Sequence, residues 1–544
     1  MGLPDFDNER FRFGSAELAS QAQIAAAGAY NFNSQTRFGG FAFGRPFGHA
    51  GLAGELIVGG ARSGKLASLL AYQLCLGGSQ HNRVILDVKA EAFFIANLLA
   101  VEGRYSYVWN PCRIAGLPFH RINPVDYIHI DSPSLIDDVI AFCEMAVPLS
   151  GAPQSRFFEM RARWFLQHIC LALVEMDGVL RLDRLYWAVM LFVGGGDEWL
   201  ERLAFPMSQS RFEDVRQCEE EIAGLRSREG GGFDGIAGEL SKSFICLSSP
   251  QLRASVSPPY DFSFKQLCDE GRLYTVNLCP KGEYVRQWAL VIKAMFLAAK
   301  TYRAAAPQAP RQHWVIDEAA QLGAAQFLLD AYTIGAGSWG VTPLTVWQST
   351  YQMRALGENA ENILLGSAGY QAYFGIRDMP SATTLSRRIG AETLEYDDEV
   401  QQAKARQGYN RALLELIDGG DVLSAGLQAT HYKRSSRIRS KQKRDVRTPD
   451  EILNMPGSKM YVFMDGVEGA IYADRYPYYE MPWMAGRYLG SPYYPPIDRV
   501  QIMGQRGPEY RRVITEAVPA RLSHFPQYQQ SGQWSYVEGF RPCL

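Results

Sequence analysis

The sequence predicts an α/β fold in which a mostly parallel central sheet is interrupted by an all-α domain. Three features indicate this class: short apolar runs alternate with helical patterns, a long internal stretch shows helical periodicity alone, and a glycine-rich turn joins one apolar run to a helix. Apolar strands that alternate with helices are typical of a parallel sheet. At 544 residues the chain exceeds one ordinary domain, so we expect two or three.

The expected strands are brief runs rich in β-branched and aromatic residues. Each is followed by a helical pattern, as the crossover connections of a parallel sheet require. In chain order they are ELIVGG (55–60), RVILDV (83–88), YSYVWN (105–110), RLYTVNL (272–278), HWVIDE (313–318), TPLTVWQ (342–348) and YQAYFGI (370–376).

Four regions follow from these patterns. Residues 1–50, rich in Gly, Ala, Phe and Asn, are expected to form an N-terminal extension of loops and short extended pieces. The sheet domain is expected to comprise residues 51–133 and 265–475, with the all-α insertion at 134–264 between them. Residues 476–544 form a Tyr/Pro-rich tail without clear periodicity. Such stretches often lie extended on a neighbouring surface, in the same subunit or in a partner.

Composition argues against several classes of protein. The 55 Lys and Arg nearly balance the 57 Asp and Glu, so no global field indicates a nucleic-acid or membrane partner. The nine cysteines lie far apart with no CxxC pair, which argues against a zinc site and for a reducing, cytoplasmic setting. The most apolar helical run, WALVIKAMFLAA (288–299), is too short to cross a bilayer. We therefore expect a buried core helix there and no transmembrane segment.

The turn IVGGARSGKLASLL (57–70) contains the pattern G-x-x-x-x-G-K in Gly59, Gly64 and Lys65. It follows an expected strand and precedes an expected helix, the context in which this pattern binds nucleotide phosphates. There the glycines let backbone N–H groups face the phosphate oxygens, and the lysine adds a cation. The alternative is a glycine-rich turn without a ligand. We predict an ATP-binding cradle formed by Gly59, Gly60, Ala61, Arg62, Ser63, Gly64, Lys65 and Leu66.

One residue of this cradle departs from the usual pattern. Leu66 stands where a hydroxyl normally coordinates Mg²⁺, and it offers no oxygen. Ser68 would project about 200° away from position 66 on the helix, which makes it a poor substitute. The sequence therefore favours nucleotide binding over turnover.

Polar residues end two of the later strands. Asp317 and Glu318 end the run HWVIDE, and an aspartate beside a phosphate cradle can hold Mg²⁺ through water while the next carboxylate polarises the attacking water. Gln348 ends the following strand, where an amide could orient water or sense the γ-phosphate. Each side chain could instead cap the next helix. With the cradle present, we predict Asp317 as the metal site and Glu318 and Gln348 as catalytic residues.

A basic segment, HYKRSSRIRSKQKRDVR (431–447), carries eight Lys or Arg residues opposed only by Asp445. It could neutralise phosphates of DNA or lie against anionic lipid. It could also be a solvated connector, which the shortage of interleaved aromatic residues favours. A DNA contact through 431–447 therefore stays one of two interpretations.

Taken together, these motifs resemble those of the type IV secretion coupling proteins, the TraG/TraD-type ATPases of conjugation. The matching segments run in order and span residues 54–476. They are GARSGK, ILDVKAE (with Asp87, Lys89 and Glu91), FHRINPVD, SRFFEMRARW, VIDEAAQLG, VWQSTYQM, FGIRDMPSATTLSRRIGAET and RTPDEILNMPGSKMYVFMDG.

The resemblance implies a RecA-like P-loop domain, interrupted by an all-α domain, that assembles as a homo-hexamer with ATP between subunits. It implies recruitment of relaxase–DNA or effector cargo to the secretion channel, with the all-α domain meeting the cargo and channel subunits as further partners. By matching motif, Lys65 would hold phosphate and Asp317 would hold Mg²⁺. Glu318 would then act on the water, and Gln348 would respond to the γ-phosphate.

Three departures from the family bear on these implications. Family members commonly begin with transmembrane helices, whereas none is expected here, so membrane attachment is either lost or supplied by another subunit. We expect a cytoplasmic protein, which such a partner could hold at the inner face of the bacterial inner membrane. Leu66 stands where relatives have Ser, Thr or Gly. Ala336 follows Gly335 where many relatives have Gly-Arg, and an arginine that reaches a neighbour's γ-phosphate is worth about 10³–10⁵ in turnover. Its replacement could be Arg377, Arg387 or Arg388, although each could equally be a solvated charge.

Three functions stay open at the level of sequence. The first is a ring-forming coupling ATPase that drives or licenses cargo entry. The second is a catalytically degenerate receptor or adaptor that binds cargo and does not hydrolyse ATP, which Leu66 and Ala336 favour. The third is a DNA translocase unrelated to secretion.

Overall fold

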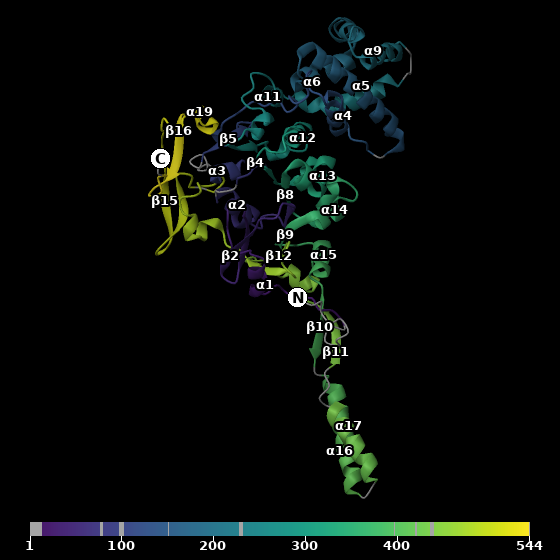
Figure 1. Cartoon of the computed structure of the whole chain (residues 1–544), viewed down its shortest axis with the longest axis vertical. Helices are drawn as coiled ribbons and strands as arrows, with labels where there is room; N and C mark the ends of the chain where they lie inside the picture. Colours follow the sequence, from purple (N-terminus) through teal and green to yellow (C-terminus); the bar gives the residue numbers. More distant parts are fainter. Residues whose placement is uncertain are drawn as a thin grey trace.

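The computed structural model describes residues 13–76, 80–96, 103–150, 152–227, 232–396, 398–418, 421–435, 440–494 and 496–542. Its centre is an 11-stranded sheet in the order β2-β1-β13-β12-β9-β3-β8-β7-β4-β6-β5. A helical region lies at one end of the molecule and a thin arm projects from the other (Figure 1).

Seven neighbouring strands of this sheet run parallel. They coincide with the seven predicted apolar runs, which confirms the predicted fold class. Every residue of β3, β4, β7 and β8 is buried, as expected for parallel strands covered on both faces. The bounds are β3 Gly54–Gly59, β4 Asn82–Leu86, β5 Arg104–Trp109, β6 Leu273–Leu278, β7 Gln312–Ile316, β8 Val341–Trp347 and β9 Ala368–Phe374.

Four antiparallel strands extend the sheet beyond β9. They are β1 Arg37–Ala42, β2 Arg45–His49, β12 Lys459–Met464 and β13 Ile471–Asp474. Two of them come from the expected N-terminal extension, residues 1–50, where the sequence analysis foresaw only loops and short extended pieces. The reason is long-range pairing: Phe41 on β1 lies opposite Asp474 on β13, more than 400 residues away.

The interval 134–264 contains helices, and no strand lies among its described residues. Its helices share one core with the sheet domain. In Figure 1 they form the region at the top. The bounds are α4 Leu135–Ala146, α5 Pro153–Asp177, α6 Leu182–Gly194, α7 Gly196–Trp199, η5 Leu200–Ala204, α8 Phe205–Ser208, α9 Glu213–Arg226, α10 Phe233–Phe244, η6 Ile245–Ser248 and α11 Pro250–Ser255.

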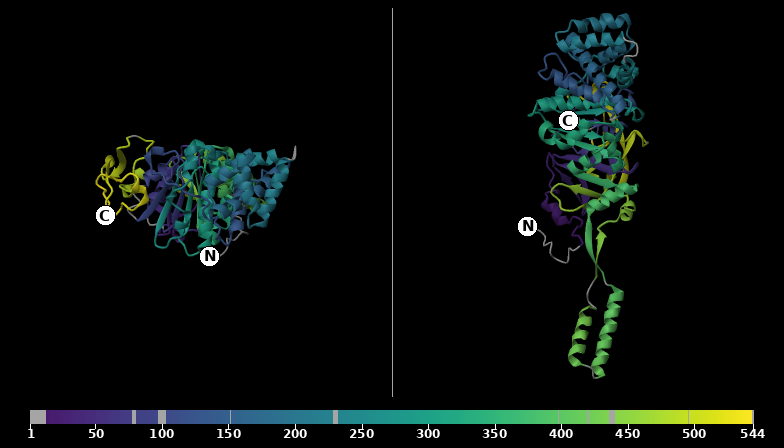
Figure 2. Two further views of the ribbon diagram at one scale, coloured as in Figure 1. Left: turned by 90° about the horizontal axis from the view of Figure 1, so that it is seen from above. Right: turned by 90° about the vertical axis from the view of Figure 1, so that its right-hand side faces the viewer.

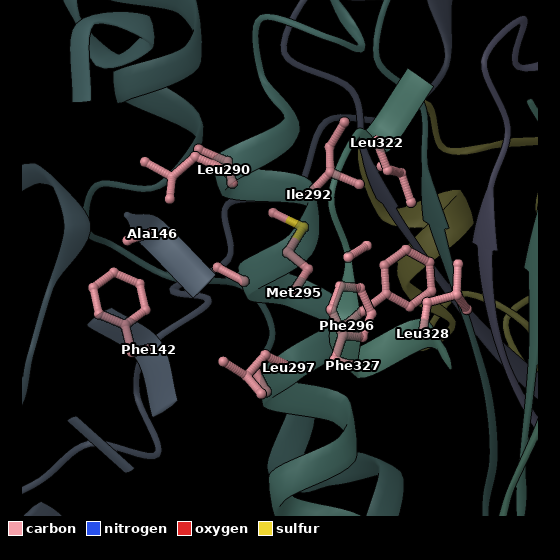
Figure 3. Close-up of a cluster of buried hydrophobic side chains, with 14 of the residues drawn as sticks. Phe142, Ala146, Leu290, Ile292, Met295, Phe296, Leu297, Leu322, Phe327 and Leu328 are labelled. Carbon is pink, nitrogen blue, oxygen red and sulfur yellow. The ribbon is translucent and has the colours of Figure 1, made fainter. Parts of the chain in front are cut away.

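A buried helix, α12 Ala289–Ala305, joins the helical region to the sheet domain. Figure 3 shows its Leu290, Met295 and Leu297 between Phe142 of α4 and Phe327 of α13. Lys293 is buried within it and donates to the carbonyl of Ala324 at 3.2 Å. The expected core helix at 288–299 is therefore confirmed. No helix in the described ranges has the length and apolarity needed to span a bilayer.

Shorter helices complete the sheet domain. Several of them follow the carboxyl ends of strands. The bounds of these shorter helices are η2 Leu66–Leu70, α2 Ala71–Cys75, α3 Glu91–Ile95, η7 Phe264–Cys268, η9 Ala319–Leu322, α13 Gln326–Thr333, η10 Gly335–Trp339, η11 Thr350–Leu356, α14 Ala360–Ser367, α15 Met379–Ile389 and α18 Pro449–Leu453, with α1 Gln21–Ala26 near the N-terminus.

The arm is a two-stranded ribbon that carries a helical hairpin (Figure 2). Strands β10 Ala391–Tyr396 and β11 Ser440–Asp445 pair antiparallel, and α16 Glu399–Ile417 packs against α17 Val422–Ser435. The basic segment 431–447 thus ends a helix and forms a paired strand, and its residues 436–439 lie outside the described part. Lys441 lies 3.5 Å from Glu395 and Arg444 lies 2.8 Å from Glu451. Acids from other segments therefore offset part of the predicted basic charge.

The Tyr/Pro-rich tail folds onto the same chain. After η12 Tyr478–Glu480 and η13 Pro482–Met484 it forms a small antiparallel sheet of β14 Arg499–Gly504, β15 Gly507–Ala517 and β16 Gln533–Val537, with α19 Pro526–Gln529. Gln527 accepts a hydrogen bond from the N–H of Ser106 at 3.0 Å and donates to the carbonyl of Arg104 at 3.1 Å. The tail thus satisfies backbone groups of the edge strand β5.

Candidate nucleotide-binding site

The predicted cradle is a tight turn between β3 and η2. Arg62 and Gly64 have left-handed φ values of 57° and 79°, and a glycine accepts such a value without strain. The N–H of Gly60 donates to the carbonyl of Gly375 at 3.2 Å. A Cβ atom on Gly60 would lie 2.4 Å from the same carbonyl oxygen, so a side chain there would displace the turn.

Lys65 folds over this turn at the start of the helix. Its Nζ donates to the carbonyl oxygens of Gly59 at 2.8 Å and Gly60 at 3.2 Å. Burial lowers the pKa of Lys65, while the nearby carboxylates of Asp317 and Glu318 raise it. The ammonium is thus held between the turn and the acidic pair, where it can meet a phosphate group.

Arg475 buttresses the turn from the end of β13. Its guanidinium donates to the Ser63 carbonyl, to the Ser68 hydroxyl at 2.9 and 3.1 Å, and to the Gly457 carbonyl at 3.1 Å. It also lies 3.6 Å above the centre of the Phe374 ring, and burial lowers its pKa to about 10. Sequence reasoning missed this residue, because no motif includes it and its place depends on the register of β13.

The side chain of Ser68 is fully engaged in this arrangement. Its hydroxyl donates to the Gly64 carbonyl at 2.8 Å and accepts from Arg475. This geometry agrees with the expectation that Ser68 does not replace the oxygen missing at Leu66.

The acidic residues lie at the carboxyl ends of β7 and β4. Burial, followed by the charge of Glu318, raises the pKa of Asp317 to about 6. Asp87 accepts backbone hydrogen bonds from Glu91 at 3.1 Å and Phe93 at 3.0 Å, yet burial raises its pKa to about 7. Both carboxyl groups therefore lie in surroundings that disfavour their ionised forms.

Glu318 adopts an unusual backbone conformation for a non-glycine residue, with φ 54° and ψ 46°. The side-chain amide of Gln321 donates to its carboxylate. Non-glycine residues in the left-handed region cost about 1–3 kcal/mol and concentrate at functional sites. Glu318 belongs to the lining of the cavity described next.

One cavity of about 770 Å³ brings most of the predicted site residues together. Its walls include the turn and helix start, the acidic pair and the exposed Gln348 at the end of β8. Gly59 and Gly60 lie in the turn but do not line it. Further walls come from residues that sequence reasoning did not place in the site: Asp87, Lys89, Glu91, Ala92 and Ile95, and Tyr478, Tyr479, Tyr488, Ser491, Tyr494, Arg499, Val500 and Tyr510 of the tail.

Lys89 adds a second lysine to the cavity. Its charge lowers the pKa of Asp317 and that of Lys65, so it lies within electrostatic reach of both. Lys89 belongs to the motif ILDVKAE, which also includes Asp87 and Glu91 and to which the sequence patterns assign no site role. Its position after an apolar strand was the signal that could have placed it here.

The three arginines suggested as replacements for the missing one lie in different settings. Arg377 lies beside the cradle, with its Cδ 3.7 Å from the position of a Cβ on Gly60. Arg388 lies 4.7 Å above the Phe463 ring and donates to the Leu365 carbonyl at 3.2 Å, and Arg387 is exposed on α15. At Ala336, the position where many relatives have the arginine, Arg311 donates a hydrogen bond to the backbone carbonyl at 2.8 Å.

Comparison with protein families places the chain in a known group. A family model described as type IV secretory system conjugative DNA transfer matches residues 17–519. The conjugal transfer protein TraG of Rhizobium radiobacter is 31% identical over 160 residues, which are 29% of this chain and 21% of that protein. TraG of Agrobacterium fabrum strain C58 is 27% identical over 238 residues, which are 43% of this chain and 32% of that protein. The chain thus spans no more than about a third of these relatives.

Solved structures share the fold at low sequence identity. The bacterial conjugative coupling protein TrwBΔN70, in a trigonal form with sulphate, has a TM-score of 0.57 at 15% identity, over 84% of this chain and 93% of that one. Plasmid coupling protein TrwB in complex with ADP and Mg²⁺ has a TM-score of 0.56 at 16% identity, over 85% of this chain and 94% of that one. These matches agree with the RecA-like P-loop fold that the resemblance implied.

Proposed function

The chain belongs to the type IV secretory system conjugative DNA transfer family, and from this premise we propose that it is a coupling protein that binds ATP and recruits cargo to a secretion channel. The observation that carries the proposal is the convergence of Lys65, Asp317, Glu318 and Gln348 on a single cavity at the carboxyl edge of the sheet. This edge is where open α/β sheets bind their ligands.

In this proposal each residue has one role. The turn from Gly59 to Gly64 directs backbone N–H groups at the phosphates, and Lys65 adds its positive charge. Glu318 orients and polarises water, and Gln348 contacts the γ-phosphate. Asp317 holds Mg²⁺ through water, and the metal supplies charge neutralisation on the phosphates when bound.

The local electrostatics support a dication beside Asp317. Burial and the neighbouring Glu318 carboxylate raise the pKa of Asp317 to about 6, so the positive charges of Lys65 and Lys89, which lower it, do not fully compensate the ionised carboxylate. Bound cations are the usual means of relieving such a deficit. The side chain of Leu66 supplies no oxygen, so Asp317 is the protein side chain that we assign to the metal.

Turnover is the step that the chain is least equipped to perform. Leu66 cannot ligate the metal, and the Ser68 hydroxyl is already engaged by Gly64 and Arg475. Ala336 cannot reach a neighbouring subunit's phosphate, although Arg311 lies next to it. We propose binding with weak hydrolysis, and a receptor or adaptor without hydrolysis is the second candidate that these two positions favour.

The helical region 134–264 is the proposed cargo surface, with relaxase–DNA or effector proteins as cargo. Large apolar side chains there are open to solvent: Phe157 is 61% exposed, Phe205 65%, Leu200 56% and Met160 54%. These exposed side chains are the positions that we propose for the contact with cargo. Channel subunits and further copies of this chain, in a homo-hexamer, are the remaining proposed partners. The ion pairs of Lys441 and Arg444 leave less free positive charge in 431–447 for a contact with DNA.

Nucleotide binding and turnover are tested separately. Calorimetric titration with ATP and Mg²⁺ should show binding by the wild type and none by Lys65→Ala, which removes the phosphate cation. Phosphate release should be slow in the wild type and absent in Glu318→Gln. Wild-type protein that binds no ATP would refute the proposal, whereas binding without release would favour the adaptor.

Cargo recruitment requires an experiment in the native cell. Site-specific crosslinking from Phe157 and Phe205 should capture relaxase, effector or channel proteins. The matched positions Tyr396 and Tyr351, which are 40% and 61% exposed outside the helical region, should capture none of them. Equal capture from both sets would argue against a specific cargo surface.

A further inference from the structure

The tail closes one side of the nucleotide cavity. The cavity is lined by residues of η12, by residues of the β14–β15 hairpin and by Tyr488, Gly490, Ser491, Tyr494 and Pro496 between them, together with the helix that follows the cradle. Figure 1 shows the tail, in yellow, alongside α2 and α3. The cavity thus has a phosphate end, formed by motif residues, and a second half formed largely by apolar and aromatic side chains.

The second half runs along the helix away from Lys65. Leu66, Leu70 and Leu74 all line the cavity, and they follow the chain from η2 into α2. Ala92 and Ile95 of α3 also line it. This apolar lining suits the nucleoside part of a nucleotide whose phosphates lie at Lys65.

The tail is fixed to the rest of the site by hydrogen bonds. The Ser491 hydroxyl donates to the Glu91 carboxylate at 2.8 Å, the Tyr493 hydroxyl donates to the Lys89 carbonyl at 2.7 Å, and the Leu489 N–H donates to the Ile95 carbonyl at 3.1 Å. The wall is therefore attached to the segment that follows β4, which also carries Lys89 and Asp87 into the cavity.

Two tyrosines of the tail line the cavity and have solvent-exposed rings. Tyr494 is 73% exposed and Tyr510 is 61% exposed, although both belong to the lining. Tyr478 and Tyr488 differ, because they are buried and pack on each other at 4.5 Å between ring centres. Within the described ranges neither Tyr494 nor Tyr510 stacks on another aromatic ring.

We infer that the tail forms the base-binding wall of the nucleotide site, and that the base stacks on Tyr494 or Tyr510 while the phosphates lie at Lys65. The inference rests on the proposed function, since it assumes the same ligand. It specifies the ligand class as nucleoside triphosphates and excludes a site for inorganic polyphosphate alone. Because stacking tolerates every base, ATP and GTP should bind with similar affinity.

The test compares ATP with inorganic tripolyphosphate, each titrated calorimetrically into full-length protein with Mg²⁺. Wild-type protein should bind ATP more tightly than tripolyphosphate. The double variant Tyr494→Ala/Tyr510→Ala should lose about tenfold or more in ATP affinity, in the range of base–aromatic stacking. Its tripolyphosphate affinity should stay within about twofold of wild type.

Two further variants separate stacking from general damage. Tyr494→Phe/Tyr510→Phe keeps both rings and should retain ATP affinity. Tyr396→Ala removes an exposed tyrosine from the β10–β11 ribbon, outside the cavity, and should change neither affinity.

The outcomes distinguish this inference from the proposed function. ATP affinity unchanged in the alanine double variant would overturn the base-binding wall and leave the phosphate site intact. Equal losses for ATP and tripolyphosphate would also overturn it, because the tail would then act on the cradle as a whole. A wild type that binds neither ligand would refute the proposed function itself.

Discussion

Replacing Glu55 tests whether a buried ion pair beneath the cradle holds β3 in place. Glu55 is fully buried in β3, four residues before Gly59, and Arg37 of β1 donates to its carboxylate while itself 5% exposed. Gln73 donates to the same carboxylate at 3.3 Å, and His49 and His313 lie 3.5 and 3.4 Å from it. One carboxylate on β3 thus connects strands β1, β2 and β7 with α2, the helix that follows the cradle.

The variant Glu55→Gln keeps the volume and removes the charge. It leaves the guanidinium of Arg37 buried without a counter-charge, and breaking such a pair costs about 3–5 kcal/mol of unfolding free energy. Urea unfolding followed by far-UV circular dichroism should show this loss. ATP affinity should fall as well, because β3 leads directly into the turn.

The double variant Arg37→Met/Glu55→Leu is the matched control. It removes both charges, and apolar replacement of a buried pair is often neutral or stabilising. We therefore expect it to be more stable than Glu55→Gln. A single variant within about 1 kcal/mol of wild type, or a double variant less stable than the single, would refute the reasoning.

The same network sets the pH dependence of stability. Burial lowers the pKa of His49 and of His313 from the usual 6.5, so the unfolded chain takes up their protons first. Proton uptake therefore favours the unfolded state. The contribution of these histidines to the free energy of unfolding is fully present above pH 6.5 and falls as the pH drops below it. Interaction with Arg37 holds the pKa of Glu55 well below its usual 4.5 despite burial, which adds a further loss in acid.

Three further outcomes are expected. Arg475→Met removes the charged donor that pairs with the Ser63 and Gly457 carbonyls and the Ser68 hydroxyl, and hydrogen bonds from a charged group contribute about 1.5–3 kcal/mol each. Differential scanning fluorimetry should therefore show a lower melting temperature, and titration should show about tenfold weaker ATP binding; an unchanged melting temperature would contradict this. Since the pKa of Asp317 is raised to about 6, Mg²⁺-dependent ATP affinity should fall as the pH is lowered through 6, and Asp317→Asn should abolish that dependence. Gly408→Leu should open the arm to proteolysis, because a Cβ there would lie 2.7 Å from the Tyr432 ring, whereas Gly426→Leu, in open space, should not; equal cleavage of the two would count against close packing of α16 on α17.

The sequence alone determined the parallel strands and the phosphate turn. Both are local: an apolar run such as ELIVGG is buried on two faces wherever it pairs, and the pattern Gly59–Lys65 specifies its own backbone conformation. The carboxyl ends of parallel strands meet at one edge, which is why Asp317, Glu318 and Gln348 could be assigned to one site before the structure was known.

The tertiary structure decided the residues that reach the site from far away in the chain. Arg475 supports the turn from β13, and the pairing of β13 with β1 and β12 follows from side-chain packing across hundreds of residues. Tyr494 and Tyr510 line one side of the cavity because hydrogen bonds hold the tail against α3 and the edge strand β5. Long-range pairings carry no local periodicity, so only the folded chain shows that its last residues complete a site begun by its first strands.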